Sequence, residues 1–370
     1  MIYFDYSATA PLLPAVQSAM SEAAKTYIGN ANSHYALGFQ SKAYLDQLTQ
    51  EIQTILKIED HDLIFTSGAS ESNNMVVQTM RRFPKEKCLI TTPLEHPSMI
   101  APLSVLQHEG YRVEFVGIDR NGQVDLAHLE ALLQTSASLV SIVAMDSETG
   151  CKQDLKAIAD VVHRYPEVLF HSDVTQALGK MDLDLTKVDY ASMSAHKLGG
   201  PIGIGLLIHR RGCPLTNLIY GGTSLSRYRS STPPLMLIAG LACSLQETLG
   251  QRDNKIQVIH QMLRDFLSGF EGVMINSPID CSPYILNFSW ISQDSHRVQA
   301  WLSDHEVYVS LKSACSMDDV PSQSVLALTQ DPKRALTSVR LSFSKQTTLN
   351  EAKQFKSIFR ACYQQLEEHR

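Results

Sequence analysis

The fold is decided by FHSDVTQ at residues 170–176 and by SMSAHKLGGP at residues 192–201. The first segment reads as a short apolar strand that ends in polar side chains, and the second carries Lys197 just before a glycine-rich turn. In α/β proteins, ligands bind outside the carboxyl ends of the parallel strands. Asp173, Gln176 and Lys197 are therefore expected to meet at one edge of such a sheet.

The chain around these segments alternates helical and strand patterns. Apolar residues recur at helical spacing in 45–56, and 155–162 is predicted to be another helix. Short apolar strands are predicted at 63–66, 89–92, 139–143, 168–171 and 202–208. Such strands, separated by helices, indicate an α/β fold with a mainly parallel sheet that helices cover on both faces.

The pattern changes to α+β after about residue 250. A helix at 256–267, a strand at 284–288 and a helix at 298–305 are predicted there. A chain of 370 residues is also longer than one average domain. We therefore predict a large domain at 14–250 and a smaller α+β domain made of 1–13 and 251–370.

Composition and charge exclude several classes of protein. A hydrophobic content of 44% and a charged content of 19% are typical of a soluble globular enzyme, and a net charge of −6 disfavours direct binding to nucleic acid. No apolar run approaches the roughly 18 residues of a membrane span, and the first residues do not resemble a signal peptide. Seven cysteines without a C-x-x-C pair disfavour disulfides and zinc, so we expect a cytoplasmic protein without a metal.

Lys197, Asp173 and Gln176 form the set of side chains that pyridoxal 5′-phosphate (PLP) requires. A lysine amine forms the Schiff base, and a carboxylate keeps the pyridine nitrogen protonated so that the ring accepts carbanion charge. A side-chain amide can bind the phenolic oxygen. We therefore predict PLP as the cofactor. The alternative is a lysine after an exposed strand and an aspartate that caps a helix.

A candidate phosphate site lies in TSGASESN at residues 66–73, which follows a predicted strand and opens a helix. Small and hydroxyl residues at a helix N-terminus can bind an anion through free N–H groups and the helix dipole. We expect Ala69 and Ser70 to hold the phosphate there, together with Ser194 and His196. A plain capped helix start would show the same pattern.

Two more residues are candidates for contacts with the cofactor or substrate. His96 follows a strand end, where it can stack on a planar cofactor and exchange protons with a substrate carbon, or simply begin a helix. Arg340 is the one arginine of an alternating strand at 338–343. It is suited to bidentate capture of a carboxylate, although an ordinary exposed arginine is the alternative.

Cys315 is the candidate nucleophile. It lies in VSLKSACSMDD, residues 309–319, where small and polar residues without an apolar period predict an exposed, mobile loop. A thiolate near Lys312 can attack an electrophile, whereas an incidental exposed cysteine is the alternative.

In their order along the chain, these motifs resemble those of cysteine desulfurases of the NifS/IscS type, in the class V branch of fold-type-I PLP enzymes. The resemblance runs nearly end to end. It is carried by YFDYSATAP (3–11), TSGASESNN (66–74), EHP (95–97), D-x-x-Q-A-x-G-K (173–180), S-x-H-K (194–197), SAC (313–315) and SVRLS (338–342).

The resemblance implies a seven-stranded sheet, a homodimer and roles for the cofactor site. Lys197 would bind PLP covalently, Asp173 would pair with the pyridine nitrogen and Gln176 with the phenolic oxygen. His96 would stack on the ring. Ser70, Ser194 and His196 would hold the phosphate, and Thr232 would reach it from the neighbouring subunit.

The resemblance also implies the reaction. Arg340, Ser147 and Ala8 would contact the substrate, L-cysteine, and Cys315 would attack its sulfur, leaving L-alanine and a persulfide. The sulfur would pass to an acceptor, either an iron–sulfur scaffold protein or a tRNA-thiolating enzyme.

Departures from the family pattern keep alternatives open. Ser147 stands where the family's H-x-N-N-E-x-G run has an asparagine, Tyr6 replaces another asparagine, and Lys312 replaces a glycine. One alternative is a related PLP lyase or aminotransferase, such as a selenocysteine lyase or a kynureninase-like enzyme, which would not need Cys315 in the same way. Another is a sulfur-relay scaffold that a partner must activate.

Overall fold

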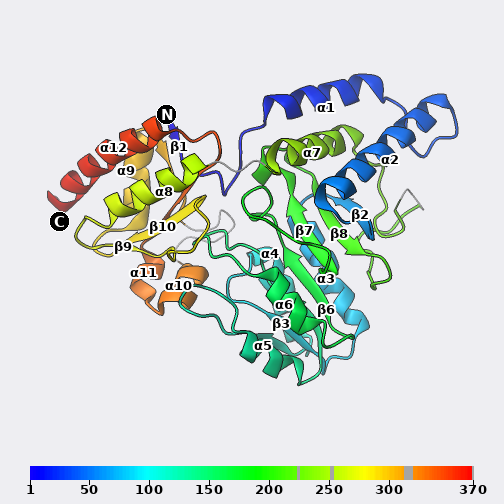
Figure 1. Ribbon diagram of the computed structural model, residues 1–370, viewed down its shortest axis with the longest axis horizontal. Coiled ribbons are helices and arrows are strands. Elements are labelled where there is room, and N and C mark those ends of the chain that lie inside the picture. Colours follow the sequence, from blue (N-terminus) through cyan, green and yellow to red (C-terminus); the bar gives the residue numbers. More distant parts are fainter. Residues whose placement is uncertain (223–225, 251–253, 312–319, 369–370) are drawn as a thin grey trace.

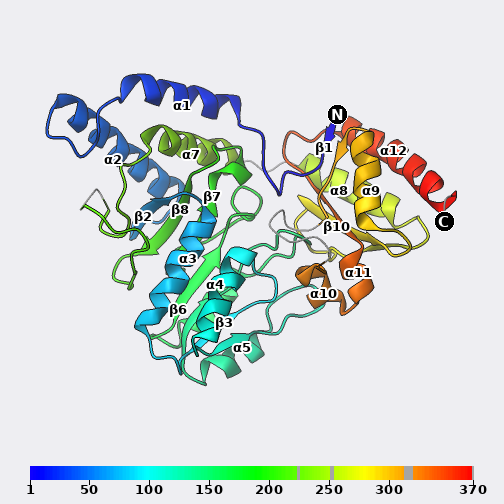
Figure 2. The same cartoon turned by 180° about the vertical axis from the view of Figure 1, so that it is seen from behind.

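The computed structural model describes residues 1–222, 226–250, 254–311 and 320–368. Figures 1 and 2 show a large sheet with helices on both of its faces, next to a smaller part that contains both ends of the chain. None of the helices in the described ranges is both long and apolar enough to cross a membrane.

The large part is built around a seven-stranded sheet with the strand order β2-β8-β7-β6-β5-β3-β4. Its strands pair in parallel, except that β8 is antiparallel to both of its neighbours. The predicted α/β fold with a mainly parallel sheet is therefore confirmed. The strands are β2 (His61–Thr66), β3 (Cys88–Thr91), β4 (Val113–Phe115), β5 (Ala137–Ser141), β6 (Leu169–Asp173), β7 (Tyr190–Ser194) and β8 (Gly205–Arg210).

Helices cover this sheet on both faces because each presents an apolar stripe to it. Buried residues of α2, α5, α6 and α7 form the core on one face, and those of α3 and α4 form the core on the other. Helix α1 packs on α7. The helices are α1 (Pro14–Thr26), α2 (Ala36–Leu56), α3 (Ala69–Thr79), α4 (Pro97–His108), α5 (Leu126–Leu133), α6 (Leu155–Val162) and α7 (Leu235–Thr248), with short 3-10 helices η1 (Met80–Arg82) and η2 (Ala195–Leu198).

Strand β7 lies in the middle of the sheet, although its sequence YASMS has no continuous apolar run. All five of its residues are buried. Its hydroxyl groups are tolerated there because they have partners: the Ser192 hydroxyl lies 3.0 Å from Nε2 of His171, and that of Ser194 accepts the backbone N–H of Ala69.

The smaller part has its own core. Strands β9, β10 and β12 form an antiparallel sheet, and β1 pairs in parallel with β11. Ile2 and Phe4 belong to this core, together with Phe355 and Trp290, and the Phe4 ring contacts that of Phe355. The elements are β1 (Ile2–Tyr3), α8 (Asn254–Leu267), β9 (Val273–Ile275), β10 (Ile285–Trp290), α9 (Ser295–Asp304), β11 (Val307–Tyr308), α10 (Gln323–Thr329), α11 (Pro332–Leu336), β12 (Ser338–Ser342) and α12 (Leu349–Glu368). We therefore propose 14–250 as one domain and 1–13 with 251–370 as the other.

The N-terminal segment crosses from one part to the other. Its Ser7 N–H donates to the Ser342 hydroxyl on β12, and its Ala10 N–H donates to the carbonyl of His196 in η2. The segment therefore lies between the small sheet and the turn that carries Lys197.

Candidate active site

One cavity of about 240 Å³ gathers most of the residues that the sequence nominated. It lies at the carboxyl ends of the parallel strands: Asp173 is the last residue of β6, Ser194 is the last of β7, and His96 follows β3. The nominated residues that line it are Ala8, Ala69, Ser70, His96, Ser147, Asp173, Gln176, Ser194, His196, Lys197 and Arg340.

The other two nominated residues are Thr232 and Cys315. Thr232 is exposed in the connection between β8 and α7, outside the lining of the cavity in its own chain. Cys315 lies outside the described residues, so its position relative to the cavity stays a prediction.

The carboxylate of Asp173 is buried and held from two sides. Oδ2 accepts a hydrogen bond from the Asn73 side-chain amide at 2.9 Å, and Oδ1 accepts the backbone N–H of Thr175 at 2.9 Å. The Asn73 amide also donates to the Ser98 hydroxyl, which lies 2.8 Å from Nδ1 of His96. These bonds link the carboxylate to the histidine through α3 and the start of α4.

Asn73 is a site residue that sequence reasoning missed. It lies three positions after Ser70 in α3, so the two residues share a face of that helix. This spacing is the signal that could have nominated it, because Ser70 was already expected to face the cofactor.

His96 is the N-cap of α4, and its Nδ1 accepts the backbone N–H of Ser98. Burial lowers the pKa of the imidazole, and nearby Asp173 offsets this only in part. The ring is therefore neutral at neutral pH. Since Nδ1 accepts a hydrogen bond, the ring proton is on Nε2.

Lys197 lies in η2, where its amine donates to the carbonyl oxygens of Ser7 and Ala8, both at 2.6 Å. The turn ends at Gly199, which has a φ of +71°, and a Cβ there would lie 2.6 Å from the Leu13 side chain. Next to the lysine, burial and the positive charge of Lys197 lower the pKa of His196 to about 4. His196 is therefore a neutral hydrogen-bonding group.

The start of α3 forms a cradle of main-chain and hydroxyl groups. The Ala69 N–H donates to the Ser194 hydroxyl at 2.7 Å. A Cβ on Gly205 would lie 2.5 Å from the Cα of Gly68, so β8 can pack this closely on the loop only because residue 205 is a glycine. The N-terminus of α3 therefore lies at the cavity and is suited to binding an anion there.

Arg229, a cation in the connection between β8 and α7, lies beside this cradle. It forms an ion pair with Glu71 in the first turn of α3, with Nε 2.5 Å from Oε1. Burial opposes ionisation of this carboxyl, but the hydrogen bonds from Arg229 and Ser67 hold its pKa below the usual value. Arg229 therefore neutralises an acidic residue beside the cradle.

Arg340 is 1% exposed and comes from the small sheet, so it is not an exposed strand arginine. Its Nη2 lies 2.8 Å from Oδ1 of Asp5, and its Nη1 donates to the carbonyl oxygen of Ser147 at 3.0 Å. Its Nε has no hydrogen-bond partner among the described residues. Asp5, which was not nominated, is thus the fixed counterion, and Ser147 contributes its backbone to this contact.

Glu95, the neighbour of His96, is also buried and was not nominated. Burial, and then the charge of Asp173, raise its pKa well above the usual value, which favours the neutral form of the carboxyl. It accepts the backbone N–H of Val143 at 2.5 Å and thereby joins the end of β3 to the end of β5. Its role in this arrangement is to hold two strand ends together.

Comparison with known proteins agrees with this geometry. The chain matches the family Aminotransferase class-V over residues 2–355. A NifS/IcsS protein homolog of Lactobacillus delbrueckii subsp. bulgaricus is 34% identical over 98% of this chain and 97% of its own length. Cysteine desulfurase IscS of Vibrio cholerae is 34% identical over 94% of this chain and 89% of its own length. The chain belongs to this family, in its NifS/IscS group of cysteine desulfurases.

The solved structures include a NifS-like protein with the same fold. It is 29% identical, covers 99% of both chains, and superposes with a TM-score of 0.89. A second NifS-like protein, from Rickettsia africae, is 26% identical with a TM-score of 0.86 over 98% of this chain and 99% of its own. The two-part architecture is therefore shared over essentially the whole chain.

Enzymes of this family use PLP, and PLP is the cofactor of this chain. The residues present fit that group. A lysine amine and a buried carboxylate, Asp173, line one cavity, and the N-terminus of α3 opens into it beside the Ser194 hydroxyl. One cavity thus contains the amine, the carboxylate that can accept a pyridinium N–H and the helix N-terminus that can bind an anion.

Proposed function

We propose that this chain is a cysteine desulfurase that converts L-cysteine to L-alanine and leaves the sulfur as a persulfide on Cys315. The observation that carries the proposal is the single cavity in which the nominated residues of α3, β6, η2 and β12 lie together. The overall change needs no oxidant. A C–S bond breaks, an S–S bond forms, and the substrate β-carbon keeps the electron pair and takes a proton.

The large domain holds the cofactor in this proposal. PLP, when bound, supplies an electron sink that acidifies the α-carbon of the substrate. Lys197 binds it and afterwards moves a proton to or from the substrate. Asp173 pairs with the pyridine nitrogen, and the bonds from Asn73 and Thr175 keep its carboxylate in one orientation before the cofactor arrives.

The phosphate is held at the start of α3 by Ala69, Ser70, Ser194 and His196. The neutral imidazole of His96 stacks on the ring and can accept a proton, because its lowered pKa leaves it uncharged.

Arg340 binds the substrate carboxylate, with Ser147 and Ala8 beside it. The guanidinium is buried and already oriented by Asp5, so its buried Nε is the group available for a new acceptor. The same ion pair weakens the attraction for a second carboxylate, which moderates substrate affinity.

The active unit is a homodimer in this proposal. Large apolar side chains are exposed around the connection between α1 and α2: Ile28, Tyr35, Leu37 and Phe39. A second copy of the chain would cover such a surface, and Thr232 would then reach the partner's phosphate. A sulfur acceptor, either an iron–sulfur scaffold protein or a tRNA-thiolating enzyme, receives the persulfide sulfur.

The decisive experiment measures L-alanine and protein-bound persulfide formed from L-cysteine. The wild type should form both in equal amounts. Cys315→Ala should keep the visible absorbance of the bound cofactor and form neither. Cys243→Ala, which removes a cysteine on α7, is the matched control and should behave as the wild type.

Two results would redirect the proposal. If Cys315→Ala formed alanine at the normal rate, another group would be the nucleophile, or the enzyme would be a lyase of the selenocysteine type. If the wild type with PLP bound became active only after a sulfur acceptor was added, the partner-activated relay would be the better description.

A further inference from the structure

Lys180 belongs to the D-x-x-Q-A-x-G-K segment but has no assigned role. Its amine donates a hydrogen bond to Oε1 of Gln176 at 2.7 Å, and Nε2 of Gln176 donates to the carbonyl oxygen of Ser7 at 2.9 Å. The same carbonyl accepts a hydrogen bond from Lys197. One short chain of bonds therefore joins Lys180, Gln176 and the lysine that binds PLP.

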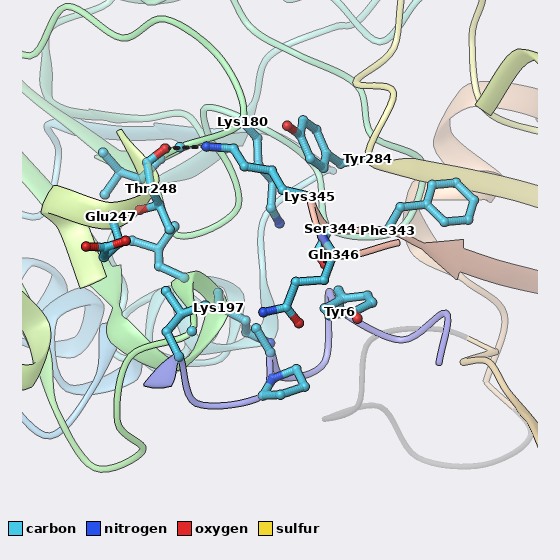
Figure 3. A pocket seen from close by; sticks show the side chains of 17 residues that line it. Tyr6, Lys180, Lys197, Glu247, Thr248, Tyr284, Phe343, Ser344, Lys345 and Gln346 are labelled. Carbon is cyan, nitrogen blue, oxygen red and sulfur yellow. Dashed lines mark hydrogen bonds between the residues drawn. The ribbon is translucent and has the colours of Figure 1, made fainter. Parts of the chain in front are cut away.

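Lys180 and Gln176 belong to two different cavities. Gln176 lines the cofactor cavity, whereas Lys180 lines a second cavity of about 230 Å³ between the two domains. Lys197 borders both. Figure 3 shows the second cavity, with Lys180, Lys345 and Glu247 around it. The amide of Gln176 thus faces the cofactor on one side and takes its hydrogen bond from Lys180 on the other.

The environment of the Lys180 amine is unusual for a lysine. Burial, followed by the charges of Lys197 and Arg340, lowers its pKa to about 7. No carboxylate among the described residues forms an ion pair with it. Of the other charged groups at this cavity, Lys345 donates to the carbonyl oxygen of Thr248, and Glu247 is exposed. A cation placed here costs stability, and its only described polar partner is an amide oxygen.

The chemistry of a carboxamide explains what this partner achieves. Its oxygen accepts hydrogen bonds and its nitrogen donates them, and the two ends exchange places on a half-turn. A protonated lysine has hydrogen-bond donors and no acceptor, so in that form Lys180 selects the orientation in which Oε1 of Gln176 faces it. The N–H groups of Gln176 must then face the opposite side, toward Ser7 and the cofactor cavity.

We propose that Lys180 is a positioning residue that fixes the side-chain amide of Gln176 with its N–H toward the phenolic oxygen of PLP. The inference rests on the proposed contact between Gln176 and that oxygen. Lys180 itself does not touch the cofactor cavity, so it acts through the amide and through its charge.

The test compares PLP binding and the pH at which the visible absorbance of the bound cofactor changes. Lys180→Met removes both donor and charge, and Lys345→Met is the matched control because it removes a lysine from the same cavity that bonds to Thr248 instead. An N–H donor and a nearby cation both stabilise the deprotonated phenolic oxygen of PLP. They therefore lower the pH at which the bound cofactor loses its proton. Lys180→Met should therefore raise the absorbance midpoint by on the order of half a pH unit.

The same variant should weaken PLP binding by about threefold to tenfold, which is the range for loss of one hydrogen bond. Lys345→Met should change neither quantity, and Lys180→Arg, which keeps donor and charge, should restore much of both. If Lys180→Met does not fold, Lys180→Gln should show a smaller shift in the same direction.

Gln176→Ala separates failure of this inference from failure of the proposed function. If Gln176→Ala shifts the midpoint and Lys180→Met does not, Lys180 has no positioning role, while the Gln176 contact stands. If Gln176→Ala has no effect, the proposed contact itself is wrong. In a Gln176→Ala background, Lys180→Met should have little further effect on PLP binding, and a fully additive effect would overturn the inference.

Discussion

The cofactor cavity has two walls that are built in different ways. On the large-domain wall, Asp173 and Ser194 end neighbouring strands of one sheet, and their partners lie in α3 or in the turn after β6. On the small-domain wall, Arg340 belongs to β12, and its guanidinium is tied to Asp5 in the N-terminal segment and to the carbonyl of Ser147 in the large domain.

This difference separates two functions. Asp173 and Ser194, which we propose to hold PLP, are fixed within the core of the large part, whereas Lys197 and Gln176 also bond to the carbonyl oxygen of Ser7 in the N-terminal segment. Arg340, which we propose to bind the substrate carboxylate, is instead held by contacts with Asp5 and with the carbonyl oxygen of Ser147, from both of the proposed domains. Cofactor binding and substrate binding should therefore respond to different mutations.

The largest effect is expected on the large-domain wall. Lys197→Ala should abolish the visible absorbance of the covalently bound cofactor and lower turnover by about 10²- to 10⁴-fold or more, because we propose that this residue both binds PLP and transfers protons. Absorbance spectra and alanine formation measure the two losses. PLP should still bind without a covalent bond through Asp173 and the start of α3, and a variant that retained the wild-type spectrum would contradict the assignment of the lysine.

An intermediate effect is expected on the small-domain wall. Arg340→Ala should weaken L-cysteine binding by about 1.5–3 kcal/mol, the range for a lost charge-assisted hydrogen bond, and raise KM by about tenfold to a hundredfold. PLP affinity should stay unchanged. Steady-state kinetics measure KM, and PLP titration measures the affinity for the cofactor. Arg340→Lys is the control that keeps the charge. Loss of PLP from Arg340→Ala would mean that the two walls are not independent.

The smallest effect concerns acid stability of the small domain. Burial, and then the charge of Arg264, lowers the pKa of His260 on α8 to about 4. The native state therefore binds fewer protons than the unfolded state below the usual histidine pKa of about 6.5. The contribution of neutral His260 to the free energy of unfolding is complete above pH 6.5 and is lost as the pH falls toward 4.

His260→Gln tests this effect, because glutamine does not titrate. The fall in Tm of the cofactor-free protein between about pH 6.5 and 4.5 should be less steep in the variant, while the binding of PLP at pH 7.5 should equal that of the wild type. An identical slope of Tm against pH in both proteins would contradict the sign of the shift.

The sheet could be predicted largely because most of its strands are apolar runs. The predicted strand 139–143 corresponds to β5, and 202–208 overlaps β8, which begins at Gly205. Strand β7 was missed, because three of the five residues in its sequence YASMS carry hydroxyl groups and it has no apolar pattern. It is a strand because neighbours on both sides supply its backbone bonds and partners for its hydroxyls, and these neighbours are set by the tertiary fold.

The residues of the cavity also divide into those that local sequence predicted and those that it missed. Local sequence was enough to nominate Lys197, Asp173 and the start of α3, because residues at strand ends and helix starts have predictable chemistry. Asn73 and Asp5 were missed as site residues, since their partners are Asp173, 100 positions away, and Arg340, 335 positions away.

Periodicity and residue chemistry are local properties, and they were enough to predict the fold class, the cofactor and most side chains of the cavity. How those side chains are held could be seen only after folding: which amide orients Asp173, which acid pairs with Arg340, and which amine faces Gln176. Such partners are residues that become neighbours in space when the chain packs. No local pattern in the sequence shows which residues these will be.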